Sequence, residues 1–225
     1  MTATNQMGKW KGEFGRAYTE RNCFTVQTNE RKYHELYSVG RREMNDEFIG
    51  SLDRSARILE VGANAGVQLA ALKEMGFYNL FGVEILDYAI AQSKTVSGEI
   101  TIIKASAFDL PFPDGFFDLV YTSGVLIHIA PIDIDMAMRE IHRCSRRYIW
   151  GFEYYSDLLV EIPYRGESGL LWKANYARMY LDTFGDLRLV RRKQYSYNGH
   201  DEKIDEMFLL EKWCEINAER PRREP

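Results

Sequence analysis

The hydrophobic and polar positions of the chain switch between two periodicities several times after residue 56. Short apolar runs, each typical of a buried strand, occupy residues 57–61, 80–83, 100–103, 117–121 and 148–152. Between them, apolar residues return at helical spacing over residues 66–75, 87–95 and 132–144. This alternation predicts a parallel sheet that helices cover on both faces.

The two ends of the chain depart from this alternation. Residues 1–29 have the aromatic spacing of a docked helix or arm, and residues 30–50 look helical and charged. Toward the other end, the pattern predicts a helix at residues 173–183, then strands at 187–195 and 207–212 around a turn at Asn198–Gly199. Two strands with no helix between them predict an antiparallel edge.

We therefore predict an α/β fold with a doubly wound, mostly parallel seven-stranded sheet and an antiparallel C-terminal edge strand. A length of 225 residues suits one domain with additions. The expected division is an N-terminal helical arm or lid at residues 1–50, one domain at residues 51–215 and a frayed tail at residues 216–225.

Composition and charge exclude several classes of protein. The net charge is −4, from 29 basic and 33 acidic residues, so we expect no nucleic-acid partner. The three cysteines form no C-x-x-C, and the four histidines have no metal-ligand spacing, so neither a disulfide framework nor a metal site is expected. Cysteine usage and the lack of a signal-peptide pattern favour a reducing, cytoplasmic location. No apolar run approaches the roughly 20 residues of a membrane span, so we expect no membrane partner.

The glycine-rich stretch EVGANAG, at residues 60–66, follows the first predicted strand. A dinucleotide-binding loop needs G-x-G-x-x-G, but counted from Gly62 the next two glycine positions hold Asn64 and Val67. No G-K-[ST] follows either, so the stretch is not a P-loop. The stretch does fit acidic-x-Gly-x-x-x-Gly, through Glu60, Gly62 and Gly66. Such a loop suits a small zwitterion, because the carboxylate faces an ammonium group and bare backbone allows close approach.

A second acidic residue, Glu84, ends the second predicted strand, 24 positions after Glu60. A carboxylate at this place can accept hydrogen bonds from both hydroxyls of a ribose, and Ile85 is placed to cover one face of a base. Glu84 by itself would be read as an exposed strand-end carboxylate. Its combination with Glu60, Gly62 and Gly66 favours a role in binding.

With these residues in view, the chain resembles the class I S-adenosylmethionine-dependent methyltransferases. EVGANAG is similar to their first motif, Glu84 to their ribose-binding acid, and residues 106–129 (SAFDLPFPDGFFDLVYTSGVLIHI) to the segment that holds adenine and forms the fourth strand. The resemblance implies a Rossmann-like fold, enzymatic activity and S-adenosylmethionine as the cofactor. It implies that the cofactor is bound by Glu60, Gly62, Ala63, Asn64, Gly66, Glu84, Ile85, Ser106, Ala107, Phe108, Thr122, Ser123 and Gly124.

One position departs from that family's pattern. Ser106 stands where the family commonly has an acidic residue that binds the adenine amino group, so this contact is weaker here or comes from elsewhere. The backbone N–H of Ala107 is expected to face the adenine ring.

A narrower resemblance covers almost the whole chain. The stretches GEFGRAYTERN (12–22), GVLIHI (124–129), EIHRCSRRYI (140–149), EYYSDLLVEIPYRG (153–166) and DLRLV (186–190) resemble the methylases associated with pseudaminic acid and related sugar biosynthesis. This resemblance implies a small-molecule acceptor, a sugar or a sugar-derived metabolite, methylated at oxygen or nitrogen. We expect a monomer or a weak homodimer.

The candidate residues around the acceptor lie after the predicted strands and in the N-terminal arm. His128 and Glu153 are the candidate bases, because a hydroxyl acceptor benefits from one. Sugar hydroxyls or acidic groups would be met by Tyr154, Tyr155, Tyr164 and Arg165. The arm would close over the cofactor through Tyr18 and Arg21.

Each of these residues also has a purely structural explanation. His128 can be a helix-start histidine bonded to backbone, Glu153 and its neighbouring tyrosines a polar rim, and Arg165 a surface arginine in a turn. Tyr18 can be a packing anchor of its helix.

Two other functional classes remain open at this point. One is a methyltransferase that acts on a protein or an RNA, and the other is a non-catalytic module that binds S-adenosylmethionine. A nicotinamide-dependent oxidoreductase is disfavoured by Asn64 and Val67.

Overall fold

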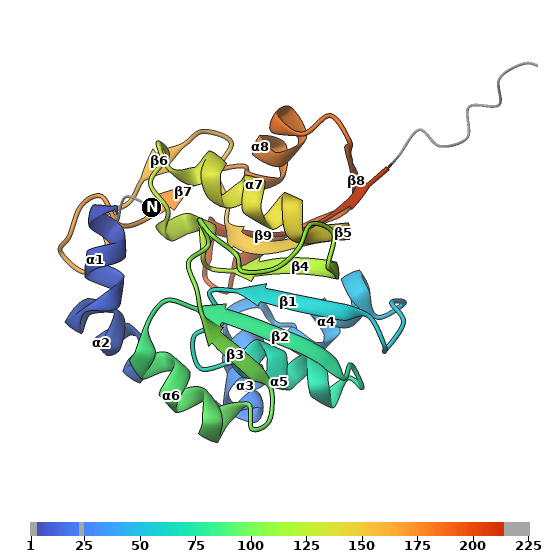
Figure 1. Ribbon diagram of the computed structural model, residues 1–225. Coiled ribbons are helices and arrows are strands. Elements are labelled where there is room, and N and C mark those ends of the chain that lie inside the picture. The colour runs from blue at the N-terminus through green and yellow to red at the C-terminus, as the bar shows by residue number, and fades with distance from the viewer. Residues whose placement is uncertain (1–3, 23–24, 214–225) are drawn as a thin grey trace, which may run out of the picture.

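A seven-stranded sheet forms the centre of the molecule in the computed structural model, which describes residues 4–22 and 25–213 (Figure 1). The strand order is β3-β2-β1-β4-β5-β9-β8. Neighbours from β3 to β5 pair in parallel, whereas β9 is antiparallel to β5 and β8 is antiparallel to β9. This arrangement confirms the predicted fold class, including the antiparallel edge.

The strands of this sheet follow the apolar runs of the sequence. Along β1, Ile58 packs into the core on one face and Leu59 into the core on the other, so the whole run is buried. The bounds are β1 (Arg57–Val61), β2 (Asn79–Glu84), β3 (Thr101–Lys104), β4 (Phe117–Ser123), β5 (Ser145–Tyr154), β8 (Leu187–Tyr197) and β9 (His200–Lys212).

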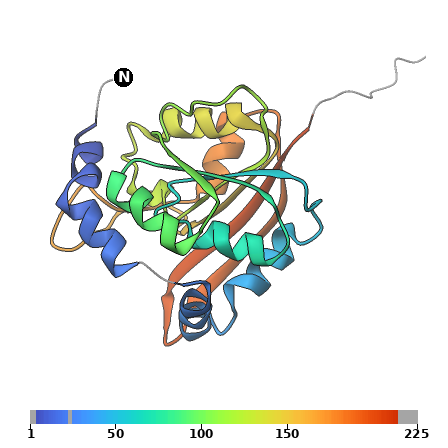
Figure 2. The ribbon, with the colours of Figure 1, turned by 60° about the horizontal axis from the view of Figure 1, so that its bottom comes forward.

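Helices cover both faces of the sheet (Figures 1 and 2). One face carries α3 (Val26–Tyr37), α4 (Arg41–Ile49), α5 (Val67–Glu74) and α6 (Asp87–Val96). The other carries α7 (Ile134–Cys144) and α8 (Tyr176–Thr183). Apolar side chains therefore form two cores, one on each side of the sheet.

Two predicted helices differ from those observed. The segment 30–50 is divided into α3 and α4 because Ser38 adopts a left-handed conformation, with φ 59°, and ends the first helix. The segment 173–183 is helical only from Tyr176 onward. Asn175 caps α8 by accepting a hydrogen bond from Arg178 N at 3.0 Å, and the preceding residues form β7 (Trp172–Lys173), which pairs with β6 (Val160–Glu161).

Two short helices, α1 (Asn5–Lys11) and α2 (Glu13–Arg21), lie beside the sheet (Figure 1). Gln6 Nε2 of α1 donates to Gly169 O at 3.1 Å, in the loop that follows β6. From α2, Arg16 lies over the Tyr88 ring of α6 at 4.8 Å. The arm is thus attached at both ends, to the 162–171 loop and to α6.

The β8–β9 hairpin reaches across the molecule to the end of α3 (Figure 2). In its turn, Asn198 N donates to Leu36 O at 2.7 Å, and Asn198 Nδ2 donates to Glu35 O at 2.9 Å. These two bonds satisfy carbonyls at the C-terminal end of α3, which have no partner inside the helix. The hairpin therefore brings β9 next to α3.

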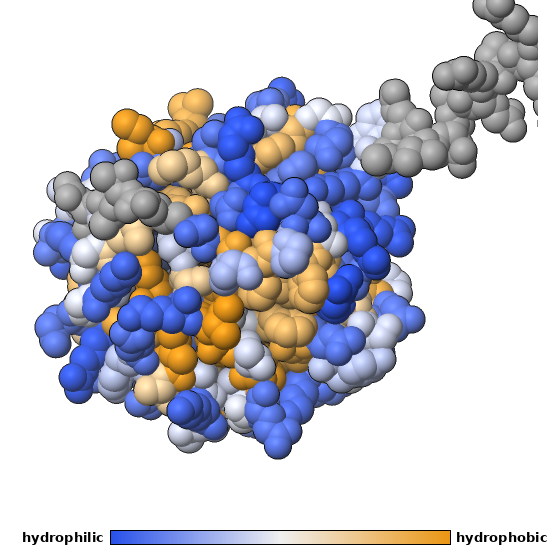
Figure 3. All heavy atoms as spheres, in the orientation of Figure 1, coloured by the Kyte–Doolittle hydropathy of each residue, from blue (hydrophilic) through white to orange (hydrophobic). Residues whose placement is uncertain are grey.

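The surface in Figure 3 is polar over most of its area, with apolar side chains gathered near the middle of the view. Among the helices of residues 4–22 and 25–213, none combines the length and apolar character needed to cross a bilayer. Within these residues, no group of three or more His, Cys, Asp and Glu side chains is placed to hold a metal ion. The tail predicted at residues 216–225, and Cys23 and Cys214, lie outside the described residues.

Candidate active site

A cavity of about 650 Å³ opens where the parallel strands end, beneath α1 and α2. One end of it, the glycine-loop end, is lined by residues 60, 62–65, 67, 68, 84–86 and 105–108. The other, the aromatic end, is lined by Tyr33, Tyr37, Phe152, Tyr154, Tyr197 and Asp205. The two ends lie at different strands of the sheet, since β2 and β9 are four strand spacings, or roughly 19 Å, apart.

The backbone of the glycine loop turns sharply at two positions. Gly62 and Gly66 have φ of 74° and 78°, the left-handed region that a Cβ makes costly. A Cβ on Gly62 would lie 2.7 Å from Val125 Cγ2, and one on Gly66 would lie 2.7 Å from Ile102 Cδ1. Asn64 is also left-handed, with φ 48°, as the residue type allows. Both glycines are therefore required by conformation and by space.

Glu84 is held rigidly at the end of β2. Its Oε2 accepts from Asn64 N at 2.8 Å, and its Oε1 accepts from Ile85 N at 2.6 Å and Leu86 N at 3.0 Å. Burial raises the pKa of Glu84, while the three N–H donors favour the charged form. Since a carboxylate has about four acceptor positions, this one keeps capacity for a further donor such as a ribose hydroxyl.

Glu60 is 3% exposed, and burial raises its pKa to about 8, while Tyr121 and Arg41 favour the charged form. Its Oε2 has no hydrogen-bond partner among the described residues, and the same holds for Asn64 Oδ1 and Gln68 Oε1. All three side chains line the cavity. A buried polar atom left without a partner costs about 1–3 kcal/mol, so this end of the cavity fits a ligand that brings hydrogen-bond donors.

His128 ends a 3₁₀ turn, η1 (Leu126–His128), and lines the cavity. Its Nδ1 lies 2.7 Å from Leu170 O. A carbonyl only accepts, so Nδ1 carries the proton and Nε2 is the free base. Burial lowers the pKa of His128 to about 4, which keeps the ring neutral at physiological pH.

Three aromatic residues surround the His128 ring. The centroid distances are 4.6 Å to Trp10, 5.3 Å to Tyr164 and 6.1 Å to Tyr18. Two of these rings come from the N-terminal arm, so the arm completes the surroundings of His128. His128 is both bonded to backbone, as its structural explanation expects, and placed in the cavity, so its role as a base stays a prediction.

Several known proteins share this architecture. Residues 59–147 match a family model described as a methyltransferase domain. This match covers less than half of the 225-residue chain. The segment runs from β1 into β5 and contains the glycine loop, Glu84 and His128.

A curated relative and two solved structures are similar to the chain. The O-methyltransferase rstn1 of Aspergillus nomiae is 29% identical over 82 residues, which are 34% of this chain and 36% of that protein. The 1,6-didemethyltoxoflavin-N1-methyltransferase of Burkholderia thailandensis, solved with its substrate and S-adenosylhomocysteine, has a TM-score of 0.70 and 15% identity, over 95% of this chain and 92% of that one. The magnesium protoporphyrin IX methyltransferase of Synechocystis PCC 6803, solved with S-adenosylhomocysteine, has a TM-score of 0.67 and 13% identity, over 92% of this chain and 98% of that one. The two structures share the fold.

Most residues predicted from the sequence line the cavity. They are Tyr18, Arg21, Glu60, Gly62, Ala63, Asn64, Glu84, Ile85, Ser106, Ala107, Phe108, Ser123, Gly124, His128, Tyr154, Tyr164 and Arg165. Ser106 Oγ accepts from Phe108 N at 3.2 Å, which shapes the turn that presents Ala107. Gly66 is absent from the lining; it begins the turn into α5 instead.

Glu153 does not line the cavity, which changes its expected role as a base. It is 2% exposed, and its oxygens accept from Val125 N at 3.2 Å and Ile127 N at 3.4 Å. Burial raises its pKa to about 7. Glu153 therefore holds the turn that carries His128. The predicted Thr122 is likewise buried and outside the lining.

Tyr155 also differs from its predicted role in substrate binding. Successive residues of a strand point to opposite faces, so Tyr154 faces the cavity and Tyr155 faces away. Its hydroxyl donates to Asp157, and Arg192 lies over its ring at 5.4 Å.

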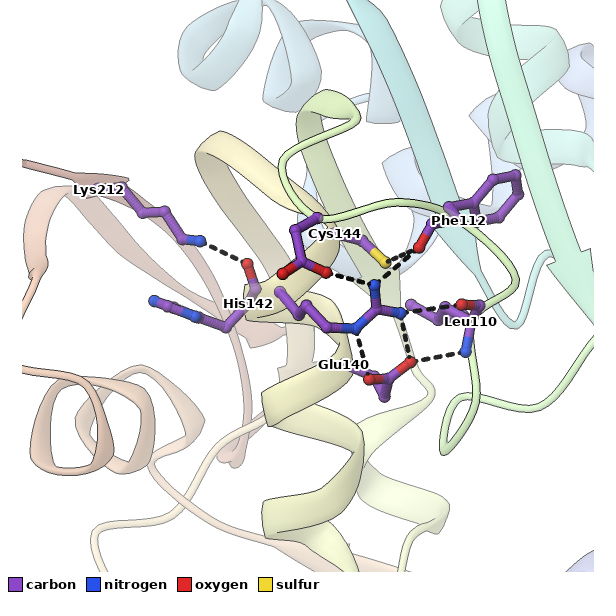
Figure 4. Close-up of polar contacts among 8 residues, drawn as sticks. Leu110, Phe112, Glu140, His142, Cys144 and Lys212 are labelled. Carbon is purple, nitrogen blue, oxygen red and sulfur yellow. Dashed lines mark hydrogen bonds and ion pairs between the residues drawn. The ribbon is translucent and has the colours of Figure 1, made fainter. Parts of the chain in front are cut away.

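The loop that carries Ser106 to Phe108 is anchored at its far end on α7 (Figure 4). Arg143 donates to Leu110 O at 2.9 Å and to Phe112 O at 2.7 Å. Glu140 Oε2 accepts from Leu110 N at 2.8 Å and pairs with Arg143. This network fixes the 110–112 segment and hence the cavity wall before it.

Sequence reasoning missed most of the aromatic end and several other lining residues. They are Trp10, Asn29, Tyr33, Tyr37, Gln68, Phe152, Tyr197 and Asp205. The spacing of Tyr33 and Tyr37, four residues apart in a predicted helix, was a signal that both share one face. Nothing local to the sequence indicated that Asp205 lies beside them.

Proposed function

We propose that this protein transfers a methyl group from S-adenosylmethionine to an oxygen or nitrogen atom of a small polar acceptor, a sugar or sugar-derived metabolite of the nonulosonic acid type. The observation that carries this proposal is a single cavity in which the glycine loop, a neutral histidine and the aromatic end meet. Its volume, about 650 Å³, is in the range of small-molecule sites. The structural neighbour from Burkholderia thailandensis also acts on a small molecule, by its name.

In this proposal, the glycine-loop end holds the cofactor. Glu84 accepts hydrogen bonds from the ribose hydroxyls, and the Ala107 N–H faces the adenine ring between Ile85 and Phe108. Glu60 faces the ammonium group, and a positive charge there lowers the cost of the buried carboxylate. S-adenosylmethionine supplies, when bound, a methyl group on a positively charged sulfur.

The N-terminal arm closes the cofactor end. Tyr18 and Arg21 line the cavity from α2, beside Ser123 and Gly124 at the end of β4. We assign Arg21 to the cofactor carboxylate. Closure by α1 and α2 excludes water, which strengthens each electrostatic contact inside.

His128 is the proposed base. Its Nε2 is unprotonated at neutral pH and takes the proton of an acceptor hydroxyl; a neutral amine acceptor has less need of this step. Glu153 acts as a positioning residue through the turn that carries His128. The acceptor is met by Tyr154, Tyr164 and Arg165.

Calorimetric titration with S-adenosylhomocysteine tests the cofactor part of the proposal. Wild type should bind, and Glu84→Ala should bind about 100-fold more weakly because a charged, multiply bonded acceptor is lost. Glu99→Ala, which removes an exposed carboxylate outside the cavity lining, is the matched control and should bind as wild type does. No binding by wild type, or equal binding by Glu84→Ala, would refute this part.

Labelled methyl transfer tests the acceptor. S-adenosylmethionine with a labelled methyl group is incubated with the protein and separate pools of sugars, proteins and RNA. Label in the sugar pool is expected. Label in protein or RNA would replace this acceptor class, and cofactor binding without transfer to any pool would support a non-catalytic module.

A further inference from the structure

Asp205 lies at the aromatic end, where none of the contacts described so far gives it a function. It is 2% exposed and lines the cavity from β9. Its Oδ2 accepts from the Tyr37 hydroxyl at 2.5 Å and from the Tyr197 hydroxyl at 3.0 Å. No Lys or Arg among the described residues forms an ion pair with it within 4.0 Å. A buried carboxylate without a direct ion pair is costly, and here only the two tyrosine hydroxyls and the more distant Lys173 and Arg41 favour its charged form.

Aromatic rings form the walls around this carboxylate. The Tyr37 ring lies 5.0 Å from Tyr197, 5.5 Å from Tyr33 and 5.9 Å from Phe152, measured between centroids. Tyr154 is paired directly opposite Asp205 across β5 and β9. The faces of aromatic rings attract cations, and most strongly where water is excluded. A carboxylate surrounded by such rings is the chemistry that recognises an ammonium group.

We propose that the aromatic end is a subsite for a protonated amine carried by the acceptor, held by Asp205 and the surrounding rings. This inference rests on the proposed function, because it places the acceptor in the same cavity. A protonated amine has no lone pair, so the group held there is an anchor and the methyl group goes to a different atom. A neutral hydroxyl would satisfy the hydrogen-bonding capacity of Asp205 but would not balance its charge.

Two probes of similar shape test this assignment. Cyclohexylamine is protonated at pH 7 and cyclohexanol is neutral, and their binding is measured by ligand-observed NMR on protein loaded with S-adenosylhomocysteine. The amine should bind wild type at least 10-fold more tightly, as charge-assisted contacts of this kind allow. Asp205→Asn should remove the preference. This variant keeps the size of the side chain and an acceptor for both tyrosine hydroxyls.

Tyr195→Phe is the matched control. Tyr195 is buried and stands on β8, directly opposite Asp205 of β9, but its hydroxyl has no partner among the described residues and it does not line the cavity. It should keep the full preference for the amine. Calorimetry with S-adenosylhomocysteine should give affinities within about twofold for wild type and both variants, because Asp205 stands on β9, four strand spacings from the β2 strand that carries Glu84.

Each other outcome overturns the inference. Equal binding of the two probes to wild type, or a preference that persists in Asp205→Asn, would show that Asp205 does not select a cation. Loss of S-adenosylhomocysteine binding in Asp205→Asn alone would place Asp205 in the cofactor site. Since the probes can also be measured without S-adenosylhomocysteine, failure of the subsite and failure of the cofactor assignment are distinguishable.

The pH dependence of the amine affinity gives a second measurement. Burial raises the pKa of Asp205 to about 6, and the tyrosine hydroxyls oppose this rise. The amine affinity should therefore fall as the pH is lowered from 7 to 5, because the carboxylate becomes neutral. The titratable and charged groups that act on Asp205 are Tyr33 and Tyr37 of α3, Arg41 of α4, Tyr154 of β5, Lys173 of β7 and Tyr197 of β8, and Lys32 of α3 lines the same cavity. Tyr37, Tyr154 and Tyr197 have raised pKa values and stay neutral in this range.

Discussion

The two ends of the cavity are built in different ways. At the glycine-loop end, backbone N–H groups of Asn64, Ile85 and Leu86 hold the Glu84 carboxylate, beside the glycines of the 60–66 stretch. At the aromatic end, side chains from α3, β5, β8 and β9 converge on a single aspartate. A site formed by backbone groups tolerates few substitutions. A site formed by side chains can change its ligand through substitutions that leave the fold the same.

Substitution of Gly62 tests the intolerance of the glycine-loop end and has the largest expected effect. In Gly62→Val, the new side chain meets Val125 and the residue must hold φ 74°. We expect no detectable binding of S-adenosylhomocysteine by calorimetry. Gly98→Val is the control, because Gly98 is also left-handed, with φ 65°, but a Cβ there meets nothing within 4 Å. Binding retained by Gly62→Val would show that this loop is not built as described.

His128 lines the cavity and belongs to neither of its two ends, so its loss should affect transfer and not cofactor binding. For a hydroxyl acceptor, His128→Asn should lower the transfer rate by about 100-fold, the usual size of a general-base contribution. Affinity for S-adenosylhomocysteine should change less than threefold. His142→Asn, in which the lost histidine pairs with Asp186, is the control.

The pH profile of wild type sharpens the same test. Burial lowers the pKa of His128 to about 4, so the base form is present throughout pH 5–8 and the rate should not rise near pH 6.5. A rate controlled by a group titrating near 6.5 would point to a different base.

The contrast between the two ends also explains why the sequence predicts the glycine-loop end but not the aromatic end. Glu60, Gly62 and Glu84 are recognisable because their spacing follows from one strand–helix–strand unit. The strands themselves are recognisable from apolar runs, since burial on both faces leaves no polar alternation. These local signals cover the sheet, most of the helices and the glycine-loop end.

The aromatic end could not be predicted in this way. Tyr37 and Asp205 are 168 residues apart, and they meet because the hairpin turn at Asn198 bonds to the end of α3. Tyr155 points away from the cavity because of the register of its strand, and a shift of that register by one residue would move each side chain to the opposite face of the sheet. Glu153 stands at the expected end of β5, but the turn after β4 takes up its carboxylate. Each of these outcomes depends on tertiary pairing.

Burying the charged carboxylate of Glu60 at the glycine-loop end should lower the stability of the fold, and this cost can be measured. Burial raises its pKa to about 8 in the folded protein, so the protonated form stabilises the fold below pH 4.5, and this contribution is lost as the pH rises from 4.5 to 8. Glu60→Gln, which stays neutral, should therefore raise the free energy of unfolding at pH 8 by about 1–3 kcal/mol. The gain should vanish near pH 4.

Urea denaturation at both pH values, without cofactor, measures this difference. Glu99→Gln at an exposed site is the control and should show no gain. Binding of S-adenosylhomocysteine by Glu60→Gln should weaken even as stability rises. A variant that is less stable than wild type at pH 8 would show that the carboxylate contributes to folding.

The smallest expected effect concerns the contact that assembles the aromatic end. Asn198→Ala removes the hydrogen bonds of its side chain with Glu35 O, at 2.9 Å, and with the Ser38 hydroxyl, at 3.0 Å, but keeps the backbone bond to Leu36 O. A loss of about 1 kcal/mol in the free energy of unfolding is expected from bonds of this kind. Because Tyr37 then holds its place beside Asp205 less firmly, cyclohexylamine should bind several-fold more weakly. Binding of S-adenosylhomocysteine should stay unchanged, and Asp201→Ala, an exposed change on the same hairpin, should affect neither ligand. If Asn198→Ala weakens both ligands equally, the two ends are coupled through the hairpin and do not vary independently.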